Sequence, residues 1–120
     1  MSGKSVLQEK SFLFAIEITK TFKELIDKKE FVMSKQLLRS GTSVGAMVRE
    51  AKNAESKADF IHKLGVAQKE CDETIYWLEL LQASGYLSLN EFERMSGKAN
   101  EILKMLRSSI LTLKGKVKTP

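Results

Sequence analysis

Three kinds of side chain in this sequence could support chemistry: its one histidine, its one cysteine and several carboxylates. Asp59 and His62 have the i, i+3 spacing of a carboxylate–histidine metal-binding pair on a helix. A di-iron helical bundle needs two Glu-x-x-His pairs and two further carboxylates, but the chain has a single histidine. The sequence therefore predicts no metal site within one subunit, and we expect His62 on the outer surface.

The cysteine and the remaining carboxylates also fail to form a catalytic group. Cys71 lies on the apolar stripe of its segment with no histidine that must be close, which favours a buried structural thiol. Of Glu70, Asp72, Glu73 and Glu79, only Glu70 and Glu73 are neighbours on a helix face. No strand followed by a glycine-rich phosphate loop is present. We therefore expect a protein that is not an enzyme and needs no cofactor.

Four segments with a 3.6-residue apolar period provide the elements that position any site. Ser5 and Ser88 each have a partner three residues on that fits a capping box, and Gly85 suits a left-handed helix stop. The expected helices cover residues 6–28, 31–54, 57–84 and 89–114, with a basic tail at 115–120. Similar lengths and short connections favour antiparallel neighbours. The prediction is an all-α, up-down-up-down antiparallel four-helix bundle, with residues 1–120 as a single domain.

The composition is that of an ordinary globular domain. Hydrophobic residues make up 42% of the chain and charged residues 29%, which argues against disorder. No apolar run approaches the ~20 residues of a membrane span, and the N-terminus lacks the apolar stretch of a signal peptide. One cysteine requires no oxidising compartment. We expect a cytoplasmic protein with no membrane partner.

The stretch RSGTSVGAMVREA, residues 39–51, places two glycines inside the second expected helix. Each costs about 1 kcal/mol relative to alanine in a helix interior, so some contact must offset this cost. The favoured interpretation is close approach of a neighbouring helix at Ser40, Gly41 and Gly45. The alternative is a ligand that lies against the exposed backbone.

The net charge of +5 is unevenly distributed along the chain. Residues 1–57 and 91–120 each carry a basic surplus of four, whereas residues 58–90 are acidic by three. This pattern suits contact with a polyanion, and it suits head-to-tail self-association equally well.

The second and fourth expected helices carry the basic side chains that a nucleic acid could contact. Arg39 and Arg49 flank the small Thr42 and Ala46, which leaves a flat strip that a phosphate backbone could approach. Few aromatics interleave with these residues, so base stacking has little support. A charge-rich outer face is also what any solvated helix shows. The hypothetical nucleic-acid-binding residues are Lys35, Arg39, Arg49, Lys52, Arg94, Lys98, Lys104 and Arg107.

Apolar residues also occur where a monomeric bundle should be polar. Two groups, one on the first and one on the third expected helix, lie off the main apolar stripes, and such patches mark protein contacts. A broad core could instead absorb some of them, Phe12 above all. The hypothetical oligomer interface consists of Phe12, Leu13, Ile16, Val66, Trp77 and Leu80. We therefore expect a homo-oligomer.

The pieces KQLLRSGTSVGAMVREA, SKADFIHKLGVAQKECDETIYWLELL and SGYLS resemble a bacterial family. Its members are four-helix bundles found as reading frames in intervening sequences of 23S ribosomal RNA genes, and many carry a ribosomal-protein-like label. The resemblance extends from Lys10 to about Leu106. Its most specific part is Arg39-Ser40-x-x-Ser43 with Glu50-Ala51, then Lys57-x-x-Phe60 and Trp77-Leu78. Met47 departs from the asparagine that is more common in the family.

The resemblance implies a ring-like oligomer, commonly a pentamer. A related branch, the accessory proteins of diversity-generating retroelements, works with a reverse transcriptase and binds nucleic acid through a basic surface. Carried over, this makes Lys35, Arg39, Arg49 and Lys52 the residues that contact a nucleic-acid backbone. The expected function is a non-enzymatic homo-oligomer that binds nucleic acid, with RNA favoured over DNA. The alternative is an interaction or scaffold module with protein partners only.

Overall fold

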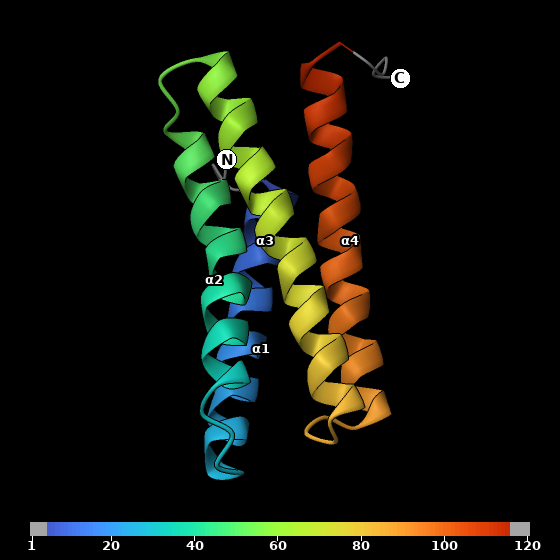
Figure 1. Ribbon diagram of the computed structural model, residues 1–120. Coiled ribbons are helices and arrows are strands. Elements are labelled where there is room, and N and C mark those ends of the chain that lie inside the picture. The colour runs from blue at the N-terminus through green and yellow to red at the C-terminus, as the bar shows by residue number, and fades with distance from the viewer. Residues whose placement is uncertain (1–4, 116–120) are drawn as a thin grey trace.

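The computed structural model describes residues 5–115, which form four helices and no strand. The helices are α1 (Val6–Asp27), α2 (Met33–Lys52), α3 (Lys57–Ala83) and α4 (Leu89–Leu113). They run alternately up and down in a bundle with extents of 45 × 26 × 23 Å (Figure 1). The predicted all-α four-helix bundle is confirmed. Of the predicted basic tail at 115–120, residues 116–120 lie outside the described part of the chain.

Serine side chains begin three of the helices. The backbone N–H of Gln8 donates to Ser5 Oγ at 3.0 Å, that of Asp59 to Ser56 Oγ at 3.0 Å, and that of Glu91 to Ser88 Oγ at 3.1 Å. At Ser88 the Glu91 carboxylate also accepts from the Ser88 N–H at 3.2 Å, which completes a capping box. These local signals are why three predicted helix starts agree with the structure.

The start of α2 differs from the predicted residue 31, because the Glu30 side chain caps the helix. The buried Glu30 carboxylate accepts from the backbone N–H groups of Ser34 at 2.6 Å and Val32 at 3.3 Å. The Ser34 hydroxyl donates back to the Glu30 carbonyl at 2.7 Å. Residues 31 and 32 therefore stay outside the helix, which begins at Met33.

Residues at positive φ follow three of the helices: Lys29 after α1, Gly85 after α3 and Gly115 after α4. Gly85 has φ of 85°, and Tyr86 N–H donates to the Leu81 carbonyl at 2.8 Å, the geometry of a Schellman stop after α3. Lys29 adopts φ of 64° after α1, where Glu30 N–H donates to the Leu25 carbonyl at 2.9 Å. Gly85 was predicted from its residue type, whereas Lys29 was not.

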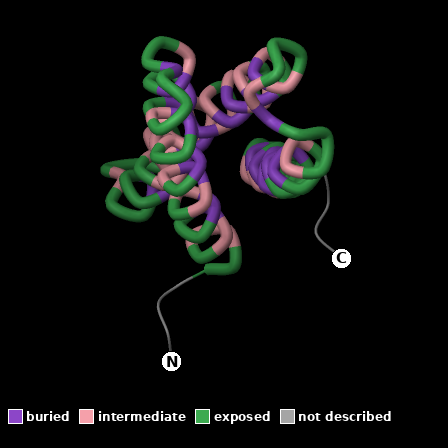
Figure 2. The backbone as a smooth tube through the Cα atoms, turned by 90° about the horizontal axis from the view of Figure 1, so that it is seen from below, coloured by how far each residue is buried: buried purple, intermediate pink, exposed green. Residues whose placement is uncertain are grey.

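The core follows the inner faces of all four helices (Figure 2). On α3, Ala67 and Thr74 are fully buried, whereas Ile61, Gln68 and Ile75 are half-buried. The largest fully buried side chains are Phe14, Ile18, Leu25, Leu37, Leu78, Leu81, Met95, Ile102 and Leu106.

The helices do not pack equally around the bundle. The interfaces α1–α2, α2–α3 and α3–α4 are extensive, the α1–α4 interface is much smaller, and α2 does not pack on α4. Figures 1 and 2 accordingly show α4 beside α3 and further from α1. The beginnings of α1 and α3 and the ends of α2 and α4 meet at one end of the bundle, called here the N/C end.

Candidate nucleic-acid interface

The candidate residues for catalytic or metal chemistry are an exposed histidine, a hydrogen-bonded carboxylate and a buried cysteine. His62 is exposed, and Asp59 accepts from the Glu55 backbone N–H at 3.2 Å. Cys71 is buried, and its thiol donates to the Ala99 carbonyl at 3.2 Å. Burial, helped by the nearby Asp72 charge, raises the pKa of the Cys71 thiol to about 12, so it stays protonated. Within residues 5–115, no group of three His, Cys, Asp or Glu side chains could hold a metal ion.

Arg39 is bound by two carboxylates of α3. Its Nη1 donates to both oxygens of Glu70 at 3.1 and 3.2 Å, and its Nη2 pairs with Glu73. The same Glu73 accepts from the Trp77 indole N–H at 3.0 Å. The Trp77 hydrogen bond, together with that of Arg39, outweighs burial and lowers the pKa of Glu73. Arg39 therefore joins α2 to α3, and the two carboxylates largely neutralise its positive charge.

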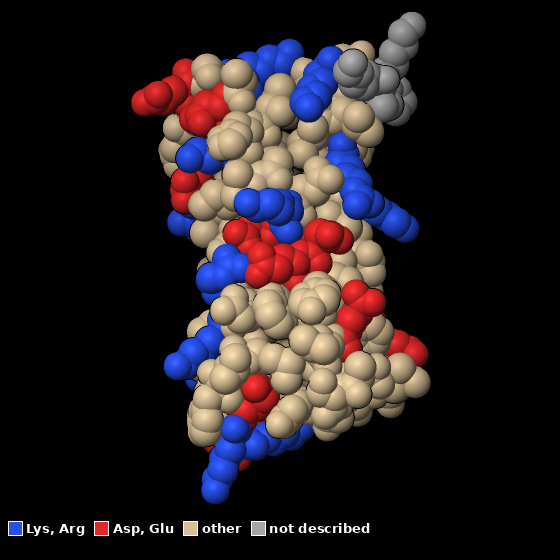
Figure 3. All heavy atoms as spheres, in the orientation of Figure 1, with Lys and Arg blue, Asp and Glu red and all other residues tan. Residues whose placement is uncertain are grey.

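Figure 3 shows acidic side chains gathered across the middle of the face on which α3 lies, with basic side chains beside them. A phosphate that approached Arg39 would have to compete with Glu70 and Glu73. Arg39 was predicted as a phosphate contact from its position on α2. The partners on α3 were not part of that prediction.

Arg94 and Lys98 are similarly engaged, because both pair with Glu17 of α1. Lys10 of α1 pairs with Glu101 of α4 at 3.2 Å. Burial alone would raise the pKa of Glu17, but the hydrogen bonds and charges of Lys98 and Arg94 together lower it. These pairs bridge the narrow α1–α4 interface.

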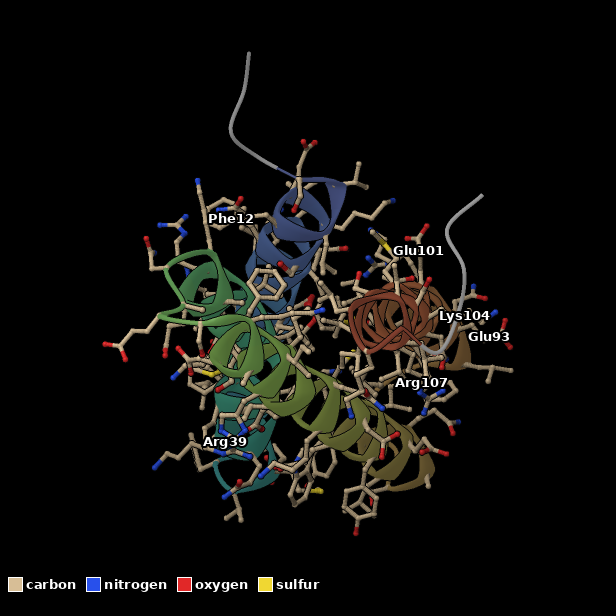
Figure 4. The ribbon with its side chains drawn as sticks, turned by 90° about the horizontal axis from the view of Figure 1, so that it is seen from above. Phe12, Arg39, Glu93, Glu101, Lys104 and Arg107 are labelled. Carbon is tan, nitrogen blue, oxygen red and sulfur yellow. The ribbon has the colours of Figure 1, made fainter. Side chains whose placement is uncertain are left out.

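The other five predicted cations have no ion-pair partner in the described part of the chain. They are Lys35, Arg49, Lys52, Lys104 and Arg107, all exposed. Figure 4 shows Lys104 pointing away from the bundle and Arg107 on the α3 side of α4. Since α2 and α4 occupy opposite corners of the bundle, the eight predicted residues do not gather on one pair of adjacent helices.

The predicted apolar interface divides into two environments. On α1, Phe12, Leu13 and Ile16 are 57%, 52% and 38% exposed. On α3, Val66, Trp77 and Leu80 are only half-buried, and Trp77 packs against the core. The Trp77 ring also meets Tyr76 edge to face, with ring centroids 5.1 Å apart. Of the two predicted groups, the α1 group is the more exposed.

The two glycines of α2 lie where α2 packs against α1. A Cβ atom on Gly41 would be 2.7 Å from Ile18 Cγ1, and one on Gly45 would be 3.2 Å from the backbone oxygen of Ser11. Ser40 instead faces α3, where its hydroxyl oxygen accepts from the buried Thr74 hydroxyl at 3.0 Å. An added Cβ at either glycine would thus be closer to α1 than ordinary van der Waals contact allows.

Two hollows open beside this region. A cavity of about 550 Å³ at the N/C end is lined by apolar side chains of all four helices, together with Lys52 and several hydroxyl groups. A groove of about 310 Å³ runs between α1 and α2. Its lining residues are Gln8, Phe12, Ala15, Thr42, Gly45, Ala46 and Arg49.

Comparison with known proteins gives the chain its family. The model of the 23S rRNA-intervening sequence protein family matches residues 4–108. The chain belongs to this family. A similar crystal structure is that of a protein with unknown function from the S23 ribosomal protein family of Bacteroides thetaiotaomicron VPI-5482. It is 51% identical, covers 88% of this chain and 98% of its own, and superposes with a TM-score of 0.87. No curated protein matches the chain.

For this member of the intervening-sequence family, sequence reasoning missed the groove between α1 and α2. The available signal was the pair of glycines on α2, which indicated that some neighbouring helix lies close. The sequence does not show that this neighbour is α1, or that α1 brings Phe12 into the same groove as Arg49. Both depend on how the helices pack. Among residues 5–115, no helix has the length and apolar character needed to cross a membrane.

Proposed function

We propose that the protein is a non-enzymatic homo-oligomer that binds nucleic acid, RNA in the first place, through the exposed cations at the N/C end of α2. The observation that carries this is that Arg49 and Lys52 are exposed and have no ion-pair partner in residues 5–115. Such side chains can neutralise phosphates and release counterions. The family name refers to intervening sequences of 23S rRNA, which makes RNA the first ligand to test.

The ion pairs decide which cations take part. Arg39, Arg94 and Lys98 already bind carboxylates, so recruiting them would require a phosphate to displace Glu70, Glu73 or Glu17. Arg49 and Lys52 require no such exchange. The net charge of +5 favours approach of any polyanion and sets no sequence preference.

The direct test is fluorescence anisotropy of labelled RNA and duplex DNA at about 50 and about 200 mM salt. The variant Arg49→Glu/Lys52→Glu should lose most binding and show a shallower salt dependence. Lys20→Glu/Lys23→Glu changes the net charge equally on exposed positions towards the other end of α1, and it should retain more affinity. Undetectable wild-type binding at low salt, or affinity independent of salt, would contradict the proposal.

Assembly is supported by a separate observation, the exposed Leu13 and Ile16 on α1. Apolar side chains adjacent on one helix face favour burial against another subunit. Light scattering should give a mass above the 13.5 kDa of one chain for the wild type, and a lower mass for Leu13→Glu/Ile16→Glu. An oligomer that forms while no nucleic acid binds would favour the alternative, a protein-interaction module.

A further inference from the structure

We propose that the groove between α1 and α2 holds one unpaired nucleobase, stacked on Phe12, with its flanking phosphate on Arg49. This inference rests on the proposed nucleic-acid binding and specifies its ligand: a single-stranded segment or unpaired loop. The two residues belong to different helices and are 37 positions apart in sequence, yet both line the same groove.

Phe12 provides a stacking surface. Its side chain is 57% exposed, so the ring is available to a ligand without rearrangement of the core. Figure 4 shows Phe12 on the side of α1 that faces α2. Every base has an aromatic face, so stacking on a phenylalanine tolerates any sequence.

Leu13 shows that Phe12 is not simply part of one apolar ridge. Although the two residues are adjacent and similarly exposed, Leu13 lines a small hollow of about 140 Å³ between α1 and α4, whereas Phe12 lines the groove towards α2. Neither Leu13 nor Ile16 lines the α1–α2 groove.

Arg49 provides the anion contact. It is exposed, and its guanidinium has no ion-pair partner among residues 5–115. Arginine binds phosphate through two parallel N–H donors, and it can also lie flat on a base. An aromatic ring and an unpaired arginine in one groove match the two parts of a nucleotide.

The groove has small residues in its lining, which suits a flat ligand. Ala15, Gly45 and Ala46 line it with at most one side-chain carbon each, and the close approach of Gly45 to the Ser11 backbone keeps the two helices together. The Gln8 carboxamide at the rim can donate to and accept from a base edge. The volume of about 310 Å³ lies at the small end of the range for ligand sites, which fits one base better than a large cofactor.

The test compares a labelled single strand with a duplex of the same sequence, for the wild type, Phe12→Ala, Phe12→Tyr, Leu13→Ala and Leu111→Ala. Phe12→Ala should weaken single-strand binding about fivefold to a hundredfold, the cost of one lost stacking contact. Duplex binding should change less than about twofold, because paired bases cannot enter the groove. Phe12→Tyr keeps the ring and should bind like the wild type. Leu13→Ala reports on the proposed subunit contact, and Leu111→Ala on α4, which is 43% exposed and lines none of the hollows described above, is the control for an exposed apolar residue.

The oligomeric mass of each variant is measured at the same time. Equal losses for RNA and DNA strands are expected, since stacking and phosphate contact are common to both. Full single-strand binding by Phe12→Ala, while Arg49→Glu/Lys52→Glu still abolishes it, would overturn the groove and leave the proposed function standing. Loss of assembly in Phe12→Ala and Leu13→Ala alike would also overturn it, by assigning Phe12 to a subunit contact. Absence of any wild-type binding would remove both proposals.

Discussion

The two sides of α1 show two ways of joining helices. Towards α2, the contact is close and uncharged: Gly41 accommodates Ile18, and Gly45 lies against the Ser11 backbone. Towards α4, the interface is small and is bridged by Glu17 with Arg94 and Lys98, and by Lys10 with Glu101. Hollows occur on both sides of α1, near Leu13 towards α4 and in the Phe12 groove towards α2, and a third at the N/C end is lined by all four helices.

This difference indicates where the stability of the bundle resides. Close packing is sensitive to a single added carbon, because interiors have no spare volume. Exposed ion pairs contribute little, typically about 0–1 kcal/mol each. The α1–α2 contact should therefore be intolerant of change, and the α1–α4 contact should be tolerant.

The largest effect is expected at Gly41. In Gly41→Ala the new Cβ would be 2.7 Å from Ile18 Cγ1 and 2.8 Å from Cγ2, so the Ile18 side chain or the helix backbone must shift. We expect the free energy of unfolding to fall by about 1–3 kcal/mol, measured by urea denaturation. Gly97→Ala is the control: no heavy atom lies within 4 Å of its added Cβ, and the helix should gain about 0.5–1 kcal/mol.

A double-mutant cycle identifies the cause at Gly41. Ile18→Ala removes all three of the carbons that crowd the new Cβ, at its own cost of about 2–5 kcal/mol. The loss of stability in the double variant should be smaller than the sum of the losses in the two single variants, because the clash between the new Cβ and Ile18 is gone. Additive losses would mean that Ile18 does not account for the effect of Gly41→Ala.

Glu30 tests whether the α1–α2 contact also depends on its connecting loop. Glu30→Ala removes the acceptor for the backbone N–H groups of Ser34 and Val32, so α2 loses its cap. The expected loss is about 1–2 kcal/mol in urea denaturation. Glu24→Ala replaces an exposed carboxylate of α1 and should change the stability far less. Equal losses of stability in Glu30→Ala and Glu24→Ala would mean that the removed charge, and not the lost cap, is the cause.

How far the sequence predicted the molecule can be judged from these residues. Helix starts at Ser5, Ser56 and Ser88 depend on hydrogen bonds over three residues, and local patterns predict them well. The cap formed by Glu30 was not predicted, because glutamate is not among the preferred N-cap types and its carboxylate acts here across four residues. The left-handed conformation of Lys29 was not predicted, because a lysine at positive φ has no sequence signal.

The site was less predictable, because its contacts join distant helices. The basic character of Arg39 was evident, but its pairing with Glu70 and Glu73 depends on the rotation and register of α2 against α3. Base stacking had little support from the sequence because no aromatic residue lies near Arg49 along the chain. Only the packing of α1 on α2 places Phe12 in the same groove.

The cavity at the N/C end offers the opposite experiment to Gly41→Ala. Ser109 of α4 is half-buried and lines this cavity beside Leu7 and Leu113. Ser109→Leu adds apolar carbons where space exists, so we expect a gain of about 0.5–2 kcal/mol. Ser96→Leu on the same helix is the control, because Ser96 is buried and lines none of the cavities described above; it should destabilise the fold. A loss with Ser109→Leu would mean that this side is as tightly packed as the α2 side.

The smallest effect is expected at Glu17, where the α1–α4 contact is charged. Glu17→Gln should lower the free energy of unfolding by less than about 1 kcal/mol at neutral pH, and less still at high salt. Because Lys98 and Arg94 outweigh burial and lower the folded-state pKa of Glu17 below 4.5, this contribution is present above pH 4.5. It is lost as the pH falls through the folded-state pKa, so the wild type and the variant should converge in acid. Glu101→Gln, with one lysine partner, should show a smaller difference. If Glu17→Gln instead lowered the free energy of unfolding as much as Gly41→Ala, the charged α1–α4 interface would contribute as much to stability as the close-packed α1–α2 interface.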